Sequence, residues 1–293
     1  ACCNIAYHSD GCCWACWVGH ALEHRTMKRQ FHFIDFVTGL VAIFSLVLIY
    51  APLAVVWVFS NWQPIRIEGA LRLSNFSWDS YQKLTENSDI LGALSTTLIV
   101  GVVSTLVALM LSTIFSLYYW RTVGFLRQLM QALILLPFLL PPIIVGLSLL
   151  ITFRELDITR GIITIIAGHI TLMIPVIYRI VLNRLVSLSP SLSEASLDLG
   201  ANQFQTFFYI LLPQIRTALI AGSLLAFAIS FDETMVTVFL SGSSSTLPIR
   251  LWAMMRLGFV PEINALAALI VFVAALATAS FGVLQLFSKT SRS

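Results

Sequence analysis

Long stretches without a single Lys, Arg, Asp or Glu limit what this chain can fold into. Six such stretches recur, and five of them have 18 or more residues. They are Phe36 to Ile65, Ile90 to Trp120, Gln128 to Phe153, Gly161 to Tyr178, Thr217 to Phe231 and Ile263 to Ser288. A helix of about 20 apolar residues crosses the hydrocarbon core of a bilayer. The pattern therefore predicts a polytopic membrane protein.

The composition excludes a soluble or disordered chain. Only 11% of the 293 residues are charged, whereas 58% are hydrophobic. A soluble domain has about a quarter charged residues, and a disordered chain is rich in charge and poor in apolar residues. We expect an all-α protein in which residues 27–293 form a single domain of six transmembrane helices.

The fifth predicted span contains two acids. Asp232 and Glu233 interrupt its apolar run, which resumes from Thr234 to Leu240. A helix from about Gln214 to Phe239 spans the membrane only if it carries both carboxyl groups. An acid at the centre of a bilayer costs on the order of 2.5 to 3.5 kcal/mol. We therefore expect Asp232 and Glu233 to line a water-filled substrate path, with a buried structural ion pair as the alternative. Successive residues of a helix point about 100° apart, so at most one of the two acids should face the path fully.

The basic residues predict the sidedness of the chain, because Lys and Arg are retained on the cytoplasmic side of a membrane. With the N-terminus inside, ten basic residues fall in the cytoplasm and seven on the other side. Both termini are therefore predicted to be cytoplasmic. The formal net charge of +3 follows from this asymmetry and requires no nucleic-acid partner.

The first 26 residues differ from the rest and are interpreted as a leader whose status the sequence leaves open. All five cysteines and three of the five histidines lie there. Cys13-x-x-Cys16 and His20-x-x-Glu23-His24 have spacings found in metal sites. Such a short segment supplies no third ligand and no packed scaffold, so we expect no metal site and no cofactor in this chain.

Enzyme activity is not expected. The sequence has no GxxxxGK[ST] loop for ATP and no GxSxG turn for a serine nucleophile. His169 is the only histidine inside a predicted span, and no nucleophile or carboxylate accompanies it at helical spacing. A histidine hydrogen-bonded between helices is the usual case. A membrane enzyme that uses His169 or the histidines of the leader is a distant alternative.

The connection between the fourth and fifth predicted spans, Asn183 to Pro213, contains two helix starts. Ser191-x-x-Glu194 has the pattern of a capping box, in which each side chain bonds to the backbone amide of the other residue. Gly200 predicts the end of this first helix, because glycine readily adopts the left-handed conformation.

A second helix start follows at Asn202-x-x-Gln205, which has the same pattern. Pro213 is expected to end or kink this second helix before the fifth span. Apolar residues recur along the helix at i, i+3, i+4 and i+7, and they predict a stripe that docks under the bundle: Phe204, Phe207, Phe208 and Leu211.

The spacing within this connection is more specific than that of an ordinary interfacial loop. It resembles the EAA signature of ABC importer permeases, EAA-x3-G-x9-I-x-LP, with Ser196 in place of the second alanine. The resemblance implies that residues 190–213 form the coupling elbow, which sits in a cleft of an ATPase subunit. The residues that carry this role are Glu194, Ala195, Ser196, Gly200, Ile210, Leu212 and Pro213.

A second resemblance lies toward the C-terminus. Its segments are Ser230-Phe231-Asp232-Glu233, Ser241-Gly242, Thr246-Leu247-Pro248, Arg256-x-Gly258 and Pro261 to Ala267. Their order is similar to that of the polyamine-type permeases, the PotC- and PotI-like subunits of spermidine and putrescine importers. The resemblance covers about Lys28 to Leu286. It implies a type I ABC importer permease fold, a bacterial inner-membrane location, and a polyamine or another small cationic solute.

The resemblance also implies partners and a mechanism. Two ATP-binding subunits would bind ATP and Mg, a second homologous permease would complete a heterodimer, and an external binding protein would deliver the solute. Import would then proceed by alternating access. The alternative is a proton-coupled secondary transporter of a small cationic solute, with Asp232 and Glu233 as its proton carriers.

Overall fold

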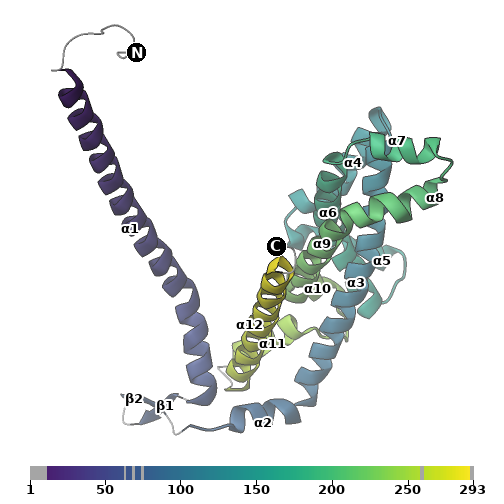
Figure 1. Cartoon of the computed structure of the whole chain (residues 1–293). Coiled ribbons are helices and arrows are strands. Elements are labelled where there is room, and N and C mark those ends of the chain that lie inside the picture. The colour runs from purple at the N-terminus through teal and green to yellow at the C-terminus, as the bar shows by residue number, and fades with distance from the viewer. Residues whose placement is uncertain (1–11, 63, 68–69, 74–75, 258–260, 291–293) are drawn as a thin grey trace. The chain divides into compact units, whose positions relative to one another are not determined.

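The computed structural model describes the backbone of all residues except 1–11, 63, 68–69, 74–75, 258–260 and 291–293. Side chains are described for residues 35–62, 76–256 and 262–276. The described chain is almost entirely helical, with one short β-hairpin (Figure 1). It forms two compact units, residues 1–80 with 264–293 and residues 81–263. The expected boundary at residue 27 stays a prediction.

The first unit contains helix α1 (Cys12–Asn61), a two-stranded hairpin and most of helix α12 (Pro261–Thr290). Strands β1 (Pro64–Ile67) and β2 (Ala70–Leu73) of the hairpin pair antiparallel. The described apolar part of α1 runs from Asp35 to Asn61 and is long enough to span a bilayer. Its large apolar side chains are mostly exposed, as expected for a helix surrounded by lipid.

Four helices of the described part are long and apolar enough to cross a membrane. A fifth crossing comes from α4 (Phe125–Leu139) and α5 (Pro142–Glu155), which pass the same test together although they are bent by 108°. The sixth expected span corresponds to α12, of which the apolar part with described side chains is Glu262–Leu276. The four single spans are Asp35–Asn61 of α1, α3 (Ser88–Arg121), α6 (Ile162–Val186) and the continuous stretch Gln203–Asp232.

Helices α3 and α6 of the second unit pack side by side and run parallel. Three serine hydroxyls of α3 donate to α6 carbonyls that are each 62 residues further along the chain: Ser104 to Ile166 (3.3 Å), Ser112 to Ile174 (3.0 Å) and Ser116 to Tyr178 (3.3 Å). A constant offset means that both helices advance in the same direction. The bent α4–α5 pair between them therefore returns the chain across the bundle and acts as one span.

The bend between α4 and α5 lies at a pair of prolines. Leu140 and Pro141 have extended backbones, and Pro142 is the first residue of α5. Proline has no amide hydrogen to donate and disfavours a helical conformation in the residue before it. The size of the bend makes the third predicted span a broken helix.

Helix α9 (Leu212–Asp232) runs antiparallel to α6. Near its start, Arg184 Nε donates to Gln214 O at 2.9 Å, and further along Gly222 packs against Ile177. Buried side chains of α3, α6 and α9 meet in the largest apolar cluster of this unit: Ala108, Met173, Ile177, Val181, Leu185, Ile215 and Ala226. This core holds α9 against α3 and α6.

The expected helix from Gln214 to Phe239 is broken, so the prediction of a continuous fifth helix was wrong. α9 ends at Asp232, Glu233 and Thr234 are not helical, and α10 (Met235–Leu240) follows. Glu233 Oε1 accepts a hydrogen bond from the amide of Val236 at 2.9 Å. The carboxylate thus satisfies the Val236 amide at the start of α10. In a continuous helix this amide would instead have donated to a backbone carbonyl of the same helix.

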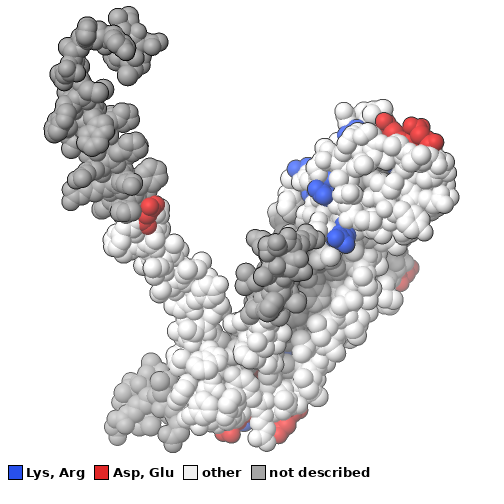
Figure 2. Space-filling model, in the orientation of Figure 1, with Lys and Arg blue, Asp and Glu red and all other residues white. Residues whose placement is uncertain are grey.

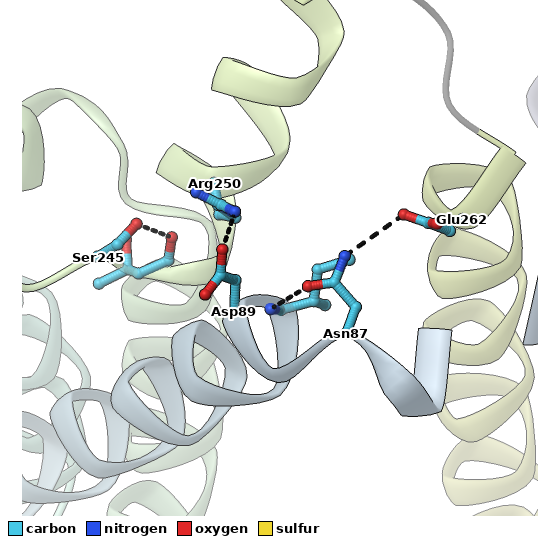
Figure 3. A network of polar contacts seen from close by, with 7 residues as sticks. Asn87, Asp89, Ser245, Arg250 and Glu262 are labelled. Atoms are coloured by element: carbon cyan, nitrogen blue, oxygen red, sulfur yellow. Dashed lines mark hydrogen bonds and ion pairs between the residues drawn. The ribbon is translucent and has the colours of Figure 1, made fainter. Parts of the chain in front are cut away.

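Polar contacts connect the start of α3 with the segments that follow α10 (Figure 3). Arg250 of α11 (Leu247–Leu257) forms an ion pair with Asp89 in the first turn of α3. Asn87, which follows α2 (Asp79–Glu86), caps α3, and its Nδ2 donates to Glu262 Oε2 at 3.5 Å. This end of the unit lies opposite the connection between α6 and α9.

Candidate functional site

The connection between α6 and α9 forms a helical elbow at one end of the bundle (Figure 1). Helix α7 (Ser191–Asp198) is followed by a turn at Gly200 and then by the short helix α8 (Gln203–Gln205). A π-helical turn, η1 (Thr206–Leu211), leads directly into α9. The sequence pattern thus correctly predicted two consecutive helical pieces.

The expected capping box at Ser191 is absent, so this prediction was wrong. Pro190 precedes α7 with helical dihedral angles, and its carbonyl accepts from the amide of Glu194 at 3.2 Å. Proline is pre-organised for the helical φ, so the helix starts one residue early. The Ser191 hydroxyl then lies within the first turn and contacts the hydroxyl of Ser189 at 2.6 Å.

The second capping box is present as predicted. Asn202 Oδ1 accepts from the Gln205 amide, and Gln205 Oε1 accepts from the Asn202 amide, both at 2.8 Å. Gly200 has φ of 85° and therefore adopts the left-handed conformation. Its amide donates to the carbonyl of Leu197 at 2.9 Å and closes α7.

Ser196, the residue that replaces the second alanine of the motif, is buried with 5% of its surface exposed. Its hydroxyl lies 2.8 Å from the hydroxyl of Thr206, which is 1% exposed. Ser196 Oγ also lies 2.9 Å from Ser193 O, and Thr206 Oγ1 lies 3.1 Å from Asn202 O, so one of the two hydroxyls donates to the other and the second donates to its carbonyl. Thr206 therefore joins the two halves of the elbow, a role that no sequence motif had indicated.

The structure brings the two parts of the motif together around one hollow. Ala195, Ser196 and Ile210 are among the residues that line this hollow, whose volume is about 480 Å³. Glu194 and Ala195 are exposed on α7. Leu212 and Pro213 instead belong to the first turn of α9, where Leu212 packs against the core cluster.

Pro213 does not end the helix, so this part of the expectation was wrong. It is the second residue of α9 and directly follows the π-helical turn, inside a continuous helical stretch. The preceding π-helical turn accommodates the proline, and the stretch Gln203–Asp232 remains one helix of 30 residues.

The apolar stripe of the elbow is divided between the core and the surface. Leu211 is 1% exposed, whereas Phe204 is 77% and Phe208 is 56% exposed. Leu199 and Tyr209 are also exposed, by 89% and 79%. An exposed group of large apolar side chains typically marks a docking surface. The prediction that the whole stripe docks under the bundle was therefore wrong.

Basic residues surround the base of this elbow. Arg121 ends α3 and Arg184 lies in the last turn of α6, while Arg127 lies in the first turn of α4 and Arg216 in the second turn of α9. Figure 2 shows basic side chains toward the end that carries α7, with acidic side chains at the outer edge of that end. The charge distribution favours a cytoplasmic elbow, and the sidedness of the termini stays a prediction.

The second candidate feature is the break between α9 and α10. Asp232 is exposed at the end of α9, while the Glu233 side chain is half-buried and caps α10. Within the described residues, neither acid forms an ion pair. The two acids therefore differ in geometry: Asp232 is free to meet solute or water, and Glu233 holds the backbone.

His169 of α6 connects the two sides of this break. The side chain is 1% exposed, its Nδ1 lies 2.7 Å from Ser230 Oγ of α9, and its Nε2 lies 2.8 Å from Thr237 Oγ1 of α10. The expectation of a histidine hydrogen-bonded between helices is confirmed. Its partners lie 61 and 68 residues away, so the sequence pattern did not reveal them.

No metal site is evident in the part of the chain that the structure describes, where no three His, Cys, Asp or Glu side chains gather. The metal-like spacings of the leader lie outside the described side chains: Cys13, Cys16, His20, Glu23 and His24.

The family described as "Binding-protein-dependent transport system inner membrane component" matches residues 108–293, which include both the elbow and the break. The chain belongs to this family. It is therefore a transport component of the bacterial inner membrane, a permease rather than an enzyme.

Named relatives of this permease are polyamine permeases. The putrescine transport system permease protein PotI of Escherichia coli K12 is 41% identical over 141 residues, which cover 46% of this chain and 50% of PotI. The chain thus spans about half the length of that relative. The spermidine/putrescine permease PotC of E. coli K12 is 31% identical over 198 residues, 67% of this chain and 74% of PotC. PotC of Haemophilus influenzae is 29% identical over 204 residues, 69% and 79% of the two chains.

Solved structures confirm the type I permease fold. A chain of a bacterial ABC transporter that imports alginate has a TM-score of 0.66 and 16% identity, over 96% of this permease and 99% of that chain. A chain of an amino acid ABC transporter has a TM-score of 0.54 and 14% identity, over 72% and 98%. At these identities the similarity concerns the fold alone.

Proposed function

We propose that this permease is the membrane subunit of an ATP-driven, binding-protein-dependent importer of polyamines such as spermidine or putrescine. The observation that carries the proposal is the elbow, where Ala195, Ser196 and Ile210 surround one hollow beside exposed apolar side chains. The family supports the importer class. The names of PotI and PotC support the substrate class.

The elbow is the proposed coupling site for an ATPase subunit. Its exposed Leu199, Phe204 and Tyr209 would lose water contact in a protein cleft, which favours docking. The seven residues expected to couple are Glu194, Ala195, Ser196, Gly200, Ile210, Leu212 and Pro213. Closure of two ATPase subunits around ATP and Mg would then displace the elbow.

Helix α9 supplies the mechanical link from the elbow to the path. It begins at Leu212, directly after η1, and its 21 residues end at Asp232. At 1.5 Å per residue the helix is about 30 Å long. A displacement of the elbow therefore reaches the break, where Asp232 and Glu233 form the proposed lining of the substrate path.

The remaining partners follow from this role. A second homologous permease would supply the other wall of the path, and an external binding protein would deliver the solute. A carboxylate at the break favours a cation over an anion, because at 4 Å a unit charge pair attracts by about 4 kcal/mol at an effective dielectric constant near 20. This electrostatic preference agrees with a polyamine substrate.

The family supports this mechanism rather than the proton-coupled alternative. A secondary transporter requires no elbow that docks an ATPase. In that alternative Asp232 and Glu233 would both exchange protons, whereas Glu233 is engaged with the Val236 amide.

Reconstituted vesicles test the proposal. The permease, its second permease and the ATPase subunits are purified together and inserted into liposomes, and the binding protein and labelled polyamine are added on the opposite side from ATP. We expect uptake that requires ATP and the binding protein. Gly200→Asp, which adds a charge and strain to the elbow, should insert normally but take up little polyamine.

Three outcomes would contradict parts of the proposal. Uptake driven by a pH gradient without ATP would support the proton-coupled alternative. ATP-dependent uptake of another solute, without uptake of polyamines, would support an ATP-driven importer but contradict a polyamine substrate. Normal uptake and normal ATPase association by Gly200→Asp would show that the elbow does not couple.

A further inference from the structure

A buried histidine from α6 holds the break between α9 and α10 together. His169 contacts Ser230 on one side of the break and Thr237 on the other, at 2.7 and 2.8 Å. We propose that His169 is a positioning residue for transport, which fixes the break so that Asp232 stays exposed to the passing cation. This inference rests on the proposed path role of Asp232.

We assign the tautomer of His169 from its hydrogen-bond network. The Thr237 hydroxyl lies 2.9 Å from the carbonyl of Glu233, to which it can donate its one hydrogen. In this assignment it accepts from Nε2–H of His169, and Nδ1 of the neutral imidazole accepts from the Ser230 hydroxyl. One chain of hydrogen bonds thus runs from α9 through α6 and α10 to the backbone of the break.

Such support is needed because a broken helix exposes backbone groups. Hydrocarbon offers no water to satisfy them, so non-helical backbone persists within a membrane protein only where protein groups or a water-filled cavity compensate. Here Thr237 satisfies the carbonyl of Glu233, and the Glu233 carboxylate satisfies the amide of Val236. Both compensating groups depend on where α10 sits.

The packing of α10 on α6 fixes that position. A Cβ added to Gly168 would lie 2.6 Å from Leu240 Cδ1 and 2.7 Å from Val236 Cγ1, so the two helices are in direct contact beside His169. Thr164 Oγ1 donates to Leu240 O at 2.9 Å, one turn nearer the start of α6. Thr164, Gly168 and His169 thus set the rotation of α10, with Glu233 turned to the cap and Asp232 left exposed.

The location suits a site in the path. His169 lies seven residues after Ile162, the first residue of α6, which is about 10 Å along the helix. The break is therefore inside the span and nearer the end opposite the elbow. In this arrangement α3 and α9 hold α6 in place. Helix α6 is then the fixed element relative to which Asp232 is positioned.

The test removes one hydroxyl while keeping the shape of the side chain. Thr237→Val deletes the partner of Nε2, and Thr237→Ser retains it. Ser112→Ala is the matched control, because it also removes a buried hydroxyl bond to α6 but lies on α3 away from the break. In the assembled transporter we expect Thr237→Val to lower the maximal polyamine uptake rate about tenfold, because it removes the two hydrogen bonds of the hydroxyl, to His169 and to the Glu233 carbonyl.

The conservative variants and a double variant separate positioning from general stability. Thr237→Ser and Ser112→Ala should keep most of the uptake. If His169 acts through Asp232, Thr237→Val should add little further loss in an Asp232→Asn background. Multiplied losses in the double variant, or normal uptake by Thr237→Val, would overturn the proposal.

A thiol measurement reports the geometry independently of transport. The five leader cysteines are replaced by serine, and Val236, which is fully buried on α10, is replaced by cysteine. We expect a water-soluble thiol reagent to modify position 236 about tenfold faster when Thr237→Val is added, and at an unchanged rate with Ser112→Ala.

The two proposals fail in distinguishable ways. If Thr237→Val leaves the thiol as protected as Ser112→Ala does, His169 does not hold the break, even where Asp232→Asn blocks uptake. If Asp232→Asn imports polyamine normally, the path role of Asp232 is wrong, and the proposed positioning role of His169 is then wrong as well. In that case, faster modification of position 236 in Thr237→Val would still show that the hydrogen bonds hold α10.

Discussion

The hydroxyl oxygens of Ser196 and Thr206 lie 2.8 Å apart and join α7 to η1 inside the elbow. Ser196 is the only residue of the carried-over motif that departs from the EAA pattern. Its polar hydroxyl is buried, and it is satisfied by Thr206 and by the carbonyl of Ser193. Thr206, in the second half of the elbow, therefore supplies a hydrogen-bond partner for the serine that replaces the alanine.

Ser196→Ala, which restores the alanine of the motif, should be nearly neutral. Thr206 keeps its bond to Asn202 O, so no buried donor loses every partner, and the loss should be at most about 1 kcal/mol. Ser196→Leu should instead overpack the buried site, cost about 1 to 3 kcal/mol and weaken ATPase association. Thermal unfolding and co-purification with the ATPase measure both variants. Equal behaviour of the two would show that the elbow is not packed at Ser196.

Gly200→Ala should destabilise the elbow by about 1 to 2 kcal/mol, because φ of 85° is strained for a residue with a Cβ. A Cβ at Gly200 meets no atom within 4 Å, so strain rather than a clash is the cause. Gly200→Asn should be milder, since asparagine tolerates the left-handed conformation. Polyamine uptake should follow the order Gly, Asn, Ala, and a reversed order would place the defect elsewhere.

Gly168→Ala should lower the melting temperature of the permease far more than Gly222→Ala. A Cβ at position 168 would lie 2.6 Å from Leu240 Cδ1, whereas at position 222 the nearest atom, Ile177 Cγ2, is 3.5 Å away. Overpacking of this kind typically costs about 1 to 3 kcal/mol. Both variants lie in helices, so helix propensity favours alanine equally. Similar melting temperatures would show that α10 has room to move on α6.

Asp232→Asn and Glu233→Gln should have different effects. Asp232→Asn removes an exposed charge and should slow polyamine import with little change in stability. Glu233→Gln keeps an oxygen that can accept from the Val236 amide, whereas Glu233→Leu removes the cap and should cost about 0.5 to 2 kcal/mol. Uptake and unfolding of the three variants are compared in one assembled complex. Unchanged import by Asp232→Asn would leave both acids as structural groups.

Local patterns predicted what depends on neighbouring residues. The long uncharged stretches indicated the membrane helices, and the Asn202 to Gln205 spacing indicated a capping box that the structure contains. Gly200 was correctly expected to end α7. The same kind of reasoning failed at Ser191, because a single residue, Pro190, shifted the start of the helix.

Such local patterns did not predict contacts between segments that are distant in the chain. The break at Glu233 lies between Ser230 and Thr237, and both of these hydroxyls contact His169 of α6, which is more than 60 residues away in the chain. Likewise, the burial of Ser196 depends on Thr206 reaching it from the other half of the elbow.

Apolar length and the EAA spacing are both properties of consecutive residues, so they were sufficient to predict a helical membrane permease. The end of α9 at Asp232, and the different surroundings of Asp232 and Glu233, were not evident from such patterns. Within a membrane each backbone group must find a partner, and at this break Thr237 and the Glu233 carboxylate supply partners from neighbouring residues. The contacts of Ser230 and Thr237 with His169 join segments that are far apart in the chain, so they form only when α6, α9 and α10 pack together.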